Sequence, residues 1–257
     1  MSRTLRSGNA YNDFPTAPPR PARTAPPNVT NNRDYTVNSR QIPAGLLRKK
    51  VAECQLEFLD VGPVDPEDPT DTNRDNHTIL RLTFLHRLKE DDTPYAPIGT
   101  RGVILDLEGF QGLNGTNRSI LMMSTFGYQG PHQTALHWKS IPMGRNKTVG
   151  DCVKIIRDTT LLPCHLDARN STLVGCRDFT SQMIYQLNLW GFLRIPANAH
   201  DSIYTLFNYR YNLPLPSAIM NLNVTPSTVD YALFRLTYPH IVITGITYTG
   251  GIRQFLP

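Results

Sequence analysis

The sequence predicts an α+β protein in which antiparallel β-strands predominate in a sandwich-like arrangement, with one to three helices and a disordered N-terminal arm. Three observations indicate this class. Several segments alternate apolar and polar residues with the period of two that strands have. One segment has clear helical spacing. The stretch from Met1 to about Gln41 is rich in proline and poor in large apolar residues, so it adds little to a core.

The predicted arm comprises residues 1–45, and residues 46–257 form a single predicted β-rich domain. Within the arm, residues 14–27 are dense in proline, which favours an extended polyproline II conformation. The whole chain has a net charge of +5, but residues 1–50 alone carry +7 and the remainder carries −2. The basic character therefore belongs to the arm, and it indicates an anionic partner such as lipid headgroups or nucleic acid.

Two hairpins are expected in the first half of the domain. Residues 51–59 and 79–88 alternate as strands do, and an acidic, proline-containing loop over residues 60–76 joins them. Residues 102–108 and 118–126 form the second pair, joined by a segment rich in glycine and asparagine, residues that tolerate the positive φ of turns.

One helix is expected over residues 149–160. Val149, Cys152, Val153 and Ile156 recur at helical spacing, Thr148 is a candidate N-cap, and Pro163 ends the segment. Downstream, alternation and β-branched or aromatic residues predict further strands. These are residues 183–189, 203–211, 231–238 and 241–249.

The sequence offers no convincing catalytic or metal-binding pattern. Residues 144–148 end like a phosphate-binding loop but lack both glycines that the motif needs, because Asn146 and Ile141 stand there. Cys152, Cys164, His165 and Cys176 are ligand types for zinc without the close pairing of structural zinc sites. We therefore expect no metal ion, no other cofactor and buried cysteine thiols.

Acid–base pairs are equally weak as sequence signals. His132 and His137 lie near Trp138, and Asp106 and Glu108 share one face of a predicted strand, as ordinary strands and loops would also show. No serine lies in the context of a nucleophile elbow. We therefore expect a binding and assembly protein, not an enzyme.

A linear motif in the arm carries the most specific functional signal. Pro15-Thr16-Ala17-Pro18 lies in an already extended, proline-rich segment, which loses little entropy on docking into a groove. This tetrapeptide resembles the P(T/S)AP late domain of matrix proteins of enveloped, mostly negative-strand RNA viruses. The resemblance implies that Pro15, Thr16, Ala17 and Pro18 bind the ubiquitin-E2-variant domain of the host ESCRT-I complex and promote budding.

The resemblance also implies a location and further partners. A matrix protein lies in the virion, in the host cytoplasm and on the inner face of host membranes, where it binds anionic lipids, forms homo-oligomers and contacts the nucleocapsid. Weak binding by single basic residues adds up through self-association. The expected membrane-binding or nucleic-acid-binding residues are Arg3, Arg6, Arg20, Arg23, Arg40, Arg48, Lys49 and Lys50.

Other functions remain open. A viral capsid or coat protein would use the same basic arm to neutralise a packaged genome, and its binding would depend steeply on salt. A plant-virus movement protein and a cellular adaptor are further alternatives. The absence of an apolar segment long enough for a signal peptide or a spanning helix leads us to expect a protein made in the cytosol.

Overall fold

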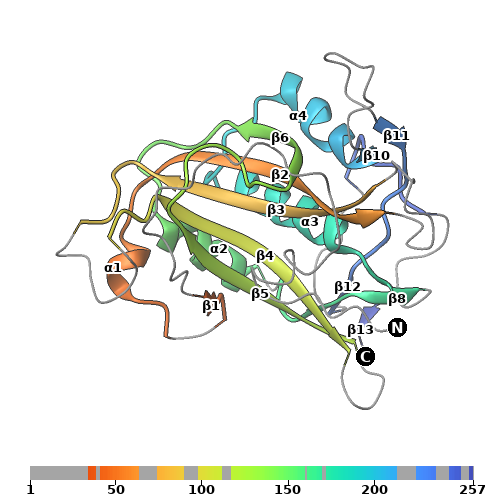
Figure 1. The fold of residues 1–257 in the computed structure, drawn as a ribbon, viewed down its shortest axis with the longest axis horizontal. Helices are drawn as coiled ribbons and strands as arrows, with labels where there is room; N and C mark the ends of the chain where they lie inside the picture. The colour runs from red at the N-terminus through yellow and green to blue at the C-terminus, as the bar shows by residue number, and fades with distance from the viewer. Residues whose placement is uncertain are drawn as a thin grey trace.

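A computed structural model describes residues 34–38, 41–63, 74–89, 98–111, 117–159, 161–169, 172–212, 224–235, 243–249 and 255–256. Its centre is a six-stranded antiparallel sheet in the order β1-β5-β4-β3-β2-β6 (Figure 1). The strands of this sheet are β1 (Asp34–Thr36), β2 (Val51–Pro63), β3 (Arg74–Phe84), β4 (Gly102–Gln111), β5 (Asn117–Phe126) and β6 (Ala135–Ile141).

Both predicted hairpins are confirmed. β2 pairs with β3 along nearly its whole length, and β4 pairs with β5 from Gly102 opposite Phe126 to Gln111 opposite Asn117. The alternation along β2 has the expected consequence, since Cys54, Leu56 and Phe58 are fully buried in the main core. The sequence did not indicate β6, which pairs with β2 and forms one edge of the sheet.

The folded domain begins earlier than the predicted boundary at residue 46. β1 pairs with β5, and Val37 and Ile42 are buried in the main core. A short helix, α1 (Ala44–Leu47), follows, with Leu46 buried. Residues 34–38 and 41–45 therefore contribute to the domain, whereas residues 1–33 of the predicted arm lie outside the described part.

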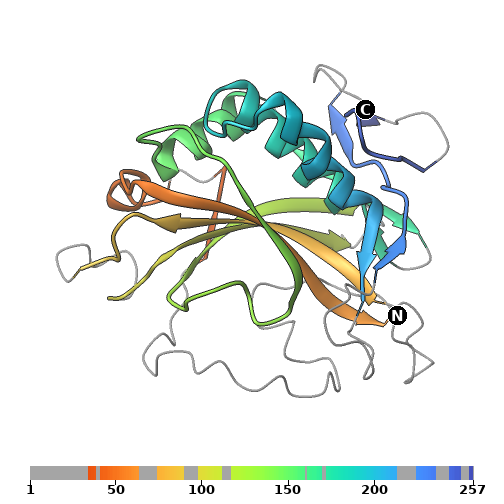
Figure 2. The same cartoon turned by 90° about the horizontal axis from the view of Figure 1, so that it is seen from above.

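Helices form the second layer, where the sequence indicated a sandwich of two sheets. α2 (Val149–Asp158) and α3 (Cys176–Leu189) cover one face of the large sheet (Figure 2). The α+β class with a dominant antiparallel sheet is thus confirmed. The described residues contain four α-helices, one more than the upper limit expected from the sequence.

The predicted helix over residues 149–160 is confirmed as α2. A capping box begins it: the Thr148 hydroxyl accepts a hydrogen bond from the Asp151 amide, and the Asp151 carboxylate accepts one from the Thr148 amide. Val149, Cys152, Val153 and Ile156 form its buried face. The same carboxylate occupies the helix start, where a phosphate-binding loop would place its anion.

Two predicted strands are wrong. Residues 183–189 belong to α3, and residues 203–211 divide among α4 (Ala197–Tyr204), a 3₁₀ turn over Thr205–Asn208 and β10 (Tyr209–Tyr211). The aromatic residues of the second segment nevertheless pack inside the protein, because Tyr204 and Phe207 are fully buried.

The C-terminal part forms small sheets against the helices. Within the described part of the predicted strand 231–238, residues 233–235 form β12 (Leu233–Arg235), and residues 236–238 lie outside the described part. Of the predicted strand 241–249, residues 243–249 are described, and there a bridge joins Tyr248 to Val229. The small sheets have the orders β10-β11, β13-β12-β7 and β8-β9. Their remaining strands are β7 (Cys164–His165), β8 (Asp167–Arg169), β9 (Thr172–Val174), β11 (Val224–Pro226) and β13 (Phe255–Leu256).

Candidate functional site

Most residues singled out from the sequence lie outside the described part of the chain. These are the motif residues Pro15, Thr16, Ala17 and Pro18 and the basic residues Arg3, Arg6, Arg20, Arg23 and Arg40. Arg48, Lys49 and Lys50 are described, and they join α1 to β2.

The structure brings other cations to Arg48, Lys49 and Lys50. The carbonyl of Lys50 accepts a hydrogen bond from the Leu85 amide, and the carbonyl of Lys147 accepts one from the Val51 amide. Three chain segments therefore meet beside α1. We call this group the basic surface; its members are Arg48, Lys49, Lys50, Arg87, Arg145 and Lys147.

A second site lies where the large sheet divides. β3 pairs with β4 only from Ile79 opposite Asp106 to Thr83 opposite Gly102. Beyond Ile79, β3 continues beside β2 down to Arg74, while β4 continues beside β5 up to Gln111. The two strands thus separate, and Figure 1 shows them diverging beside α3. Such a gap admits a side chain from the helical layer.

The start of α3 lies at this gap. The Thr78 hydroxyl donates to the carbonyl of Cys176 at 3.4 Å and to the Thr180 hydroxyl at 3.1 Å. Thr78 therefore faces the helices. Because neighbouring strand residues face opposite sides, His77 projects from the other face of the sheet, together with Asp106 of β4.

A left-handed glycine sets the position of Cys176. Gly175 has a φ of 110°, and a Cβ atom there would lie 3.0 Å from both the Cα of Ala232 and the carbonyl oxygen of Tyr231. Only glycine fits this conformation and this close approach. Cys176 consequently occupies the first position of a 14-residue helix, where the helix dipole stabilises an anion.

Cys176, His77 and Asp106 form a relay. Nε2 of His77 pairs with Oδ1 of Asp106, and the same imidazole hydrogen-bonds the Cys176 thiol. His77 is 3% exposed, the Asp106 side chain is 14% exposed, and Cys176 is partly exposed. Cys176 as a residue is thus partly exposed, while the groups that orient its thiol are held inside the protein.

The relay favours a thiolate beside an imidazolium. Burial alone would raise the pKa of Cys176, but the His77 hydrogen bond and the charges of His77 and Arg177 lower it overall. Burial would lower the pKa of His77, but the Asp106 carboxylate and Cys176 raise it well above its usual value. Each partner therefore stabilises the charged form of the other.

The buried thiols behave differently. Cys54 and Cys152 are fully buried in the main core, and burial is the main cause that raises the pKa of each. Cys164 is also fully buried. The four cysteines are free thiols, so the expectation of buried thiols is confirmed for three of them, and Cys176 is the partly exposed one.

The residues considered for zinc do not converge. Cys152 lies in α2, Cys164 and His165 in β7, and Cys176 at the start of α3. Over the ranges that the structure describes, no group of three or more His, Cys, Asp or Glu side chains is placed to hold a metal ion. In the relay, His77 stands between the other two groups, which suits proton transfer better than chelation.

The residues considered from the sequence as acid–base pairs have different surroundings in the structure. Asp106 belongs to the relay, and Glu108 follows it on the same strand face. Burial, followed by the carboxylates of Asp106 and Asp34, raises the pKa of Glu108 to about 7. His137 instead stacks on Tyr211 with ring centroids 4.4 Å apart, so it belongs to the packing of the domain.

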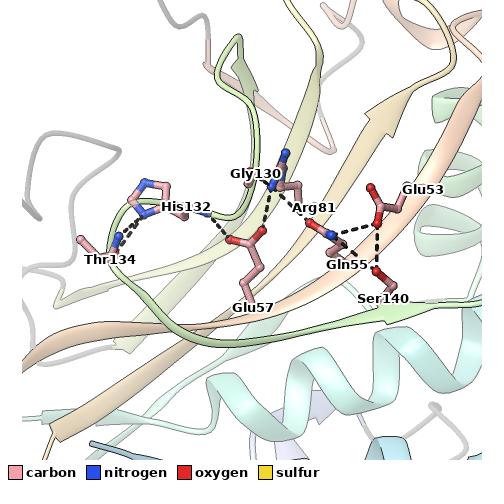
Figure 3. Close-up of polar contacts among 8 residues, drawn as sticks. All are labelled: Glu53, Gln55, Glu57, Arg81, Gly130, His132, Thr134 and Ser140. Atoms are coloured by element: carbon pink, nitrogen blue, oxygen red, sulfur yellow. Dashed lines mark hydrogen bonds and ion pairs between the residues drawn. The ribbon is translucent and has the colours of Figure 1, made fainter. Parts of the chain in front are cut away.

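His132 belongs to a buried polar network on the face of the sheet away from the helices (Figure 3). The Glu57 carboxylate pairs with Arg81 at 3.1 Å and accepts the His132 amide at 2.8 Å. Arg81 also donates to Gln55 and to the carbonyl of Gly130. Burial lowers the pKa of His132 to about 4, so its ring is neutral. This network holds the segment before β6 against the sheet.

Comparison with known protein families, characterised proteins and solved structures finds no match to this chain. Among the described helices, none combines the length and apolar character required to cross a membrane. The functional interpretation of Cys176, His77 and Asp106 is thus based on their arrangement in this structure. A sequence signal for it does exist: an apolar segment, a glycine and then a cysteine mark a strand-to-helix transition at Val174-Gly175-Cys176.

Proposed function

We propose that this protein is a cysteine-nucleophile enzyme that cleaves or transfers acyl groups. The observation that carries the proposal is the hydrogen-bonded relay of Cys176, His77 and Asp106, with Cys176 at the N-terminus of a helix. A nucleophile, a base and a group that orients the base are the parts that covalent acyl transfer requires. The sequence alone led us to expect a protein without enzymatic activity, and the proposal departs from that expectation.

The reaction follows from the charges of the relay. The Cys176 thiolate attacks the carbonyl carbon of an ester, thioester or amide, and the carbon–sulfur bond forms as the carbonyl electrons move to oxygen. Amide hydrogens in the first turn of α3 stabilise this oxyanion. The electrons of the oxyanion then re-form the carbonyl, the bond from its carbon to the leaving group breaks, and the His77 imidazolium gives its proton to the leaving group. Water, deprotonated by His77, releases the acyl group as a carboxylic acid and restores the thiolate, and an amine or alcohol in its place gives acyl transfer.

The first test compares the reactivity of the four cysteines in the folded protein. Cys176 is expected to react with iodoacetamide at pH 6.5 at least about tenfold faster than Cys54, Cys152 and Cys164, because only the thiolate attacks. Peptide mass spectrometry after timed quenching measures each site. A His77→Gln variant should slow the alkylation of Cys176 at this pH, and a Lys154→Gln variant, changed at an exposed position of α2, serves as the control.

A second test asks whether Cys176 also attacks an ester. Wild-type protein should form a covalent acyl adduct with p-nitrophenyl acetate, seen as a mass increase on Cys176, and Cys176→Ala should not. If Cys176 alkylates no faster than the buried cysteines and no acyl adduct forms, the enzyme proposal is wrong.

A second function, that of a viral matrix protein, is supported by the basic surface. Its three segments come together only in the fold, and they extend the positive charge of the sequence beyond Arg48, Lys49 and Lys50. Leu85, 52% exposed, lies among these cations. Cations around an exposed aliphatic side chain suit an anionic leaflet. In this proposal, Pro15-Thr16-Ala17-Pro18 recruits ESCRT-I, and self-association strengthens membrane binding.

Charge reversal tests the second function. The double variant Lys50→Glu, Arg145→Glu is expected to bind vesicles containing phosphatidylserine at least about 30-fold more weakly, since each basic residue near such a surface contributes about 1 kcal/mol. Co-sedimentation measures this, with Lys154→Glu as the control. Pro15→Leu, Pro18→Leu should separately trap budding particles at the membrane of expressing cells. Equal vesicle binding by all variants, without particle release by the wild type, would reject the matrix proposal.

A further inference from the structure

A second carboxyl lies on the same face of the sheet as the imidazole of the relay. β3 and β4 are antiparallel, and their ladder ends with Ile79 opposite Asp106. Two positions further along the same register, His77 comes opposite Glu108. Asp106 and Glu108 flank the buried core residue Leu107, so both side chains project from the face that His77 shares. The relay uses the first of these carboxyls and leaves the second without a role.

Glu108 and His77 are both shielded from water. Glu108 is 6% exposed and His77 is 3% exposed. On the other side of β4, the aliphatic Ile120 of β5 is directly opposite Glu108. Charges in such surroundings act on one another more strongly than charges separated by water. A carboxylate at Glu108 therefore stabilises an imidazolium at His77.

The elements around Glu108 contribute further charged or titratable residues. Besides those of the relay, these are Asp34 of β1, Glu57 of β2, Arg81 of β3, Arg118 of β5, His132 before β6 and His165 of β7. Glu57 and Arg81 form an ion pair, and the ring of His132 is neutral. Burial, Asp106 and Asp34 raise the pKa of Glu108 to about 7, and the charge of His77 opposes this effect. Glu108 therefore changes from a neutral acid to a carboxylate as pH rises through about 7.

The interaction between Glu108 and His77 is reciprocal. Because the imidazolium favours the carboxylate form of Glu108, the carboxylate favours the imidazolium form of His77 to the same extent. Asp106 pairs directly with the ring and supports the imidazolium in acid as well as in alkali. Glu108 adds its support only where it is ionised.

We propose that Glu108 is a positioning residue of the relay, whose carboxylate keeps the proton on His77 in alkaline solution. This inference rests on the proposed enzyme function and adds the regulation of the same site by pH. The imidazolium is the group that gives a proton to the leaving group, so its loss would stop acyl transfer. Glu108 thus extends the activity of Cys176 toward higher pH.

The experiment titrates the reactivity of Cys176 in the full-length protein. The rate of its alkylation by iodoacetamide is measured by peptide mass spectrometry between pH 4 and pH 10. Two inflections are expected in the wild type. The acid one marks formation of the thiolate beside the imidazolium. The alkaline one marks loss of the imidazolium proton, after which the thiolate is the stronger nucleophile.

Glu108→Gln should lower the alkaline inflection by at least about half a pH unit and leave the acid one unchanged, because Glu108 is neutral in acid. Glu108→Asp keeps a carboxylate and should retain most of the wild-type value. Glu53→Gln is the matched control, since it makes the same change on β2, where the carboxylate accepts from Gln55 and Ser140, and it should keep both inflections.

The outcomes separate this inference from the enzyme proposal. If Glu108→Gln leaves the alkaline inflection in place while Cys176 still reacts faster than the buried cysteines, the inference is overturned and the enzyme proposal stands. Equal shifts in Glu108→Gln and Glu108→Asp, a shift of both inflections, or faster alkylation of Cys54, Cys152 and Cys164 would indicate a packing role for Glu108 and also overturn it. If Cys176 of the wild type alkylates no faster than the buried cysteines, both proposals fail.

Discussion

An Asp106→Asn variant is expected to lose about 1,000-fold in kcat/KM for acyl transfer by Cys176, with little change in folding. An asparagine can still contact the imidazole, but it does not carry the negative charge that stabilises the imidazolium beside the thiolate. Because that carboxylate is the largest cause raising the pKa of His77, its loss shifts the equilibrium toward neutral imidazole and thiol. Steady-state hydrolysis of p-nitrophenyl acetate measures the loss.

The pH dependence of Cys176 alkylation distinguishes a change in the thiol pKa from a loss of folded protein in Asp106→Asn. In the wild type, the lowered pKa of Cys176 keeps the rate with iodoacetamide high well below pH 8.5, the ordinary pKa of cysteine. In Asp106→Asn the rising limb should move to higher pH. Asp158→Asn, changed at an exposed position of α2, should match the wild type. An unchanged profile in Asp106→Asn would show that Asp106 does not support the thiolate.

An Arg81→Met variant is expected to lose about 3–5 kcal/mol of unfolding free energy, the largest effect on stability that we anticipate. The Arg81 and Glu57 side chains are 4% and 0% exposed, so removal of the cation leaves a carboxylate buried without its charged partner. The guanidinium also lies 4.3 Å from the centroid of the Phe126 ring, and this contact is lost too. Denaturation by urea measures the change, and Lys154→Met is the exposed control.

The deficit of Arg81→Met should grow as pH rises. Burial raises the pKa of Glu57 above 4.5 in the folded protein, and the His132 amide and Arg81 partly oppose this effect. A carboxyl with a raised folded-state pKa binds more protons in the folded protein, so stability falls as pH rises through and above 4.5. Without Arg81 the pKa is higher still. A double variant with Glu57→Gln should recover much of the loss at pH 8, and equal deficits at pH 5 and pH 8 would contradict this explanation.

The strands and the helix with regular periodicity could be predicted from the sequence. Cys54, Leu56 and Phe58 alternate because one face of β2 is buried by helices, and α2 is amphipathic because only one of its faces meets the core. In such elements the spacing of apolar residues shows which face is buried. The short edge strand β1 lies in a polar, proline-poor stretch that is too short to show a period.

α3 could not be predicted because it is buried on nearly every side. Arg177, Asp178, Ser181 and Gln182 are buried together with Phe179, Met183 and Ile184, so polar and apolar residues do not segregate onto two faces. The alternating residues from Met183 onward then indicated a strand. A helix surrounded by protein loses the amphipathic signal that identifies surface helices.

The relay could not be predicted for a different reason. His77 and Cys176 are 99 positions apart, and their contact depends on the separation of β3 from β4, which no local pattern encodes. Asp106 and Glu108 were noticed as a pair, but their shared strand face could not distinguish a catalytic carboxylate from a solvated one. The chemistry of each residue was visible in the sequence, and their proximity was not.

The close approach of Ala232 to Gly175 also orders events during synthesis. His77 and Asp106 leave the ribosome well before Cys176, and the segment around Ala232, which holds the first turn of α3 through the Asp178 carboxylate, leaves it later still. The contacts that lower the pKa of the Cys176 thiol come from His77, Arg177 and Thr78. They therefore form only after the start of α3 has been synthesised and has packed against β3, and the segment around Ala232 then completes the surroundings of that helix start.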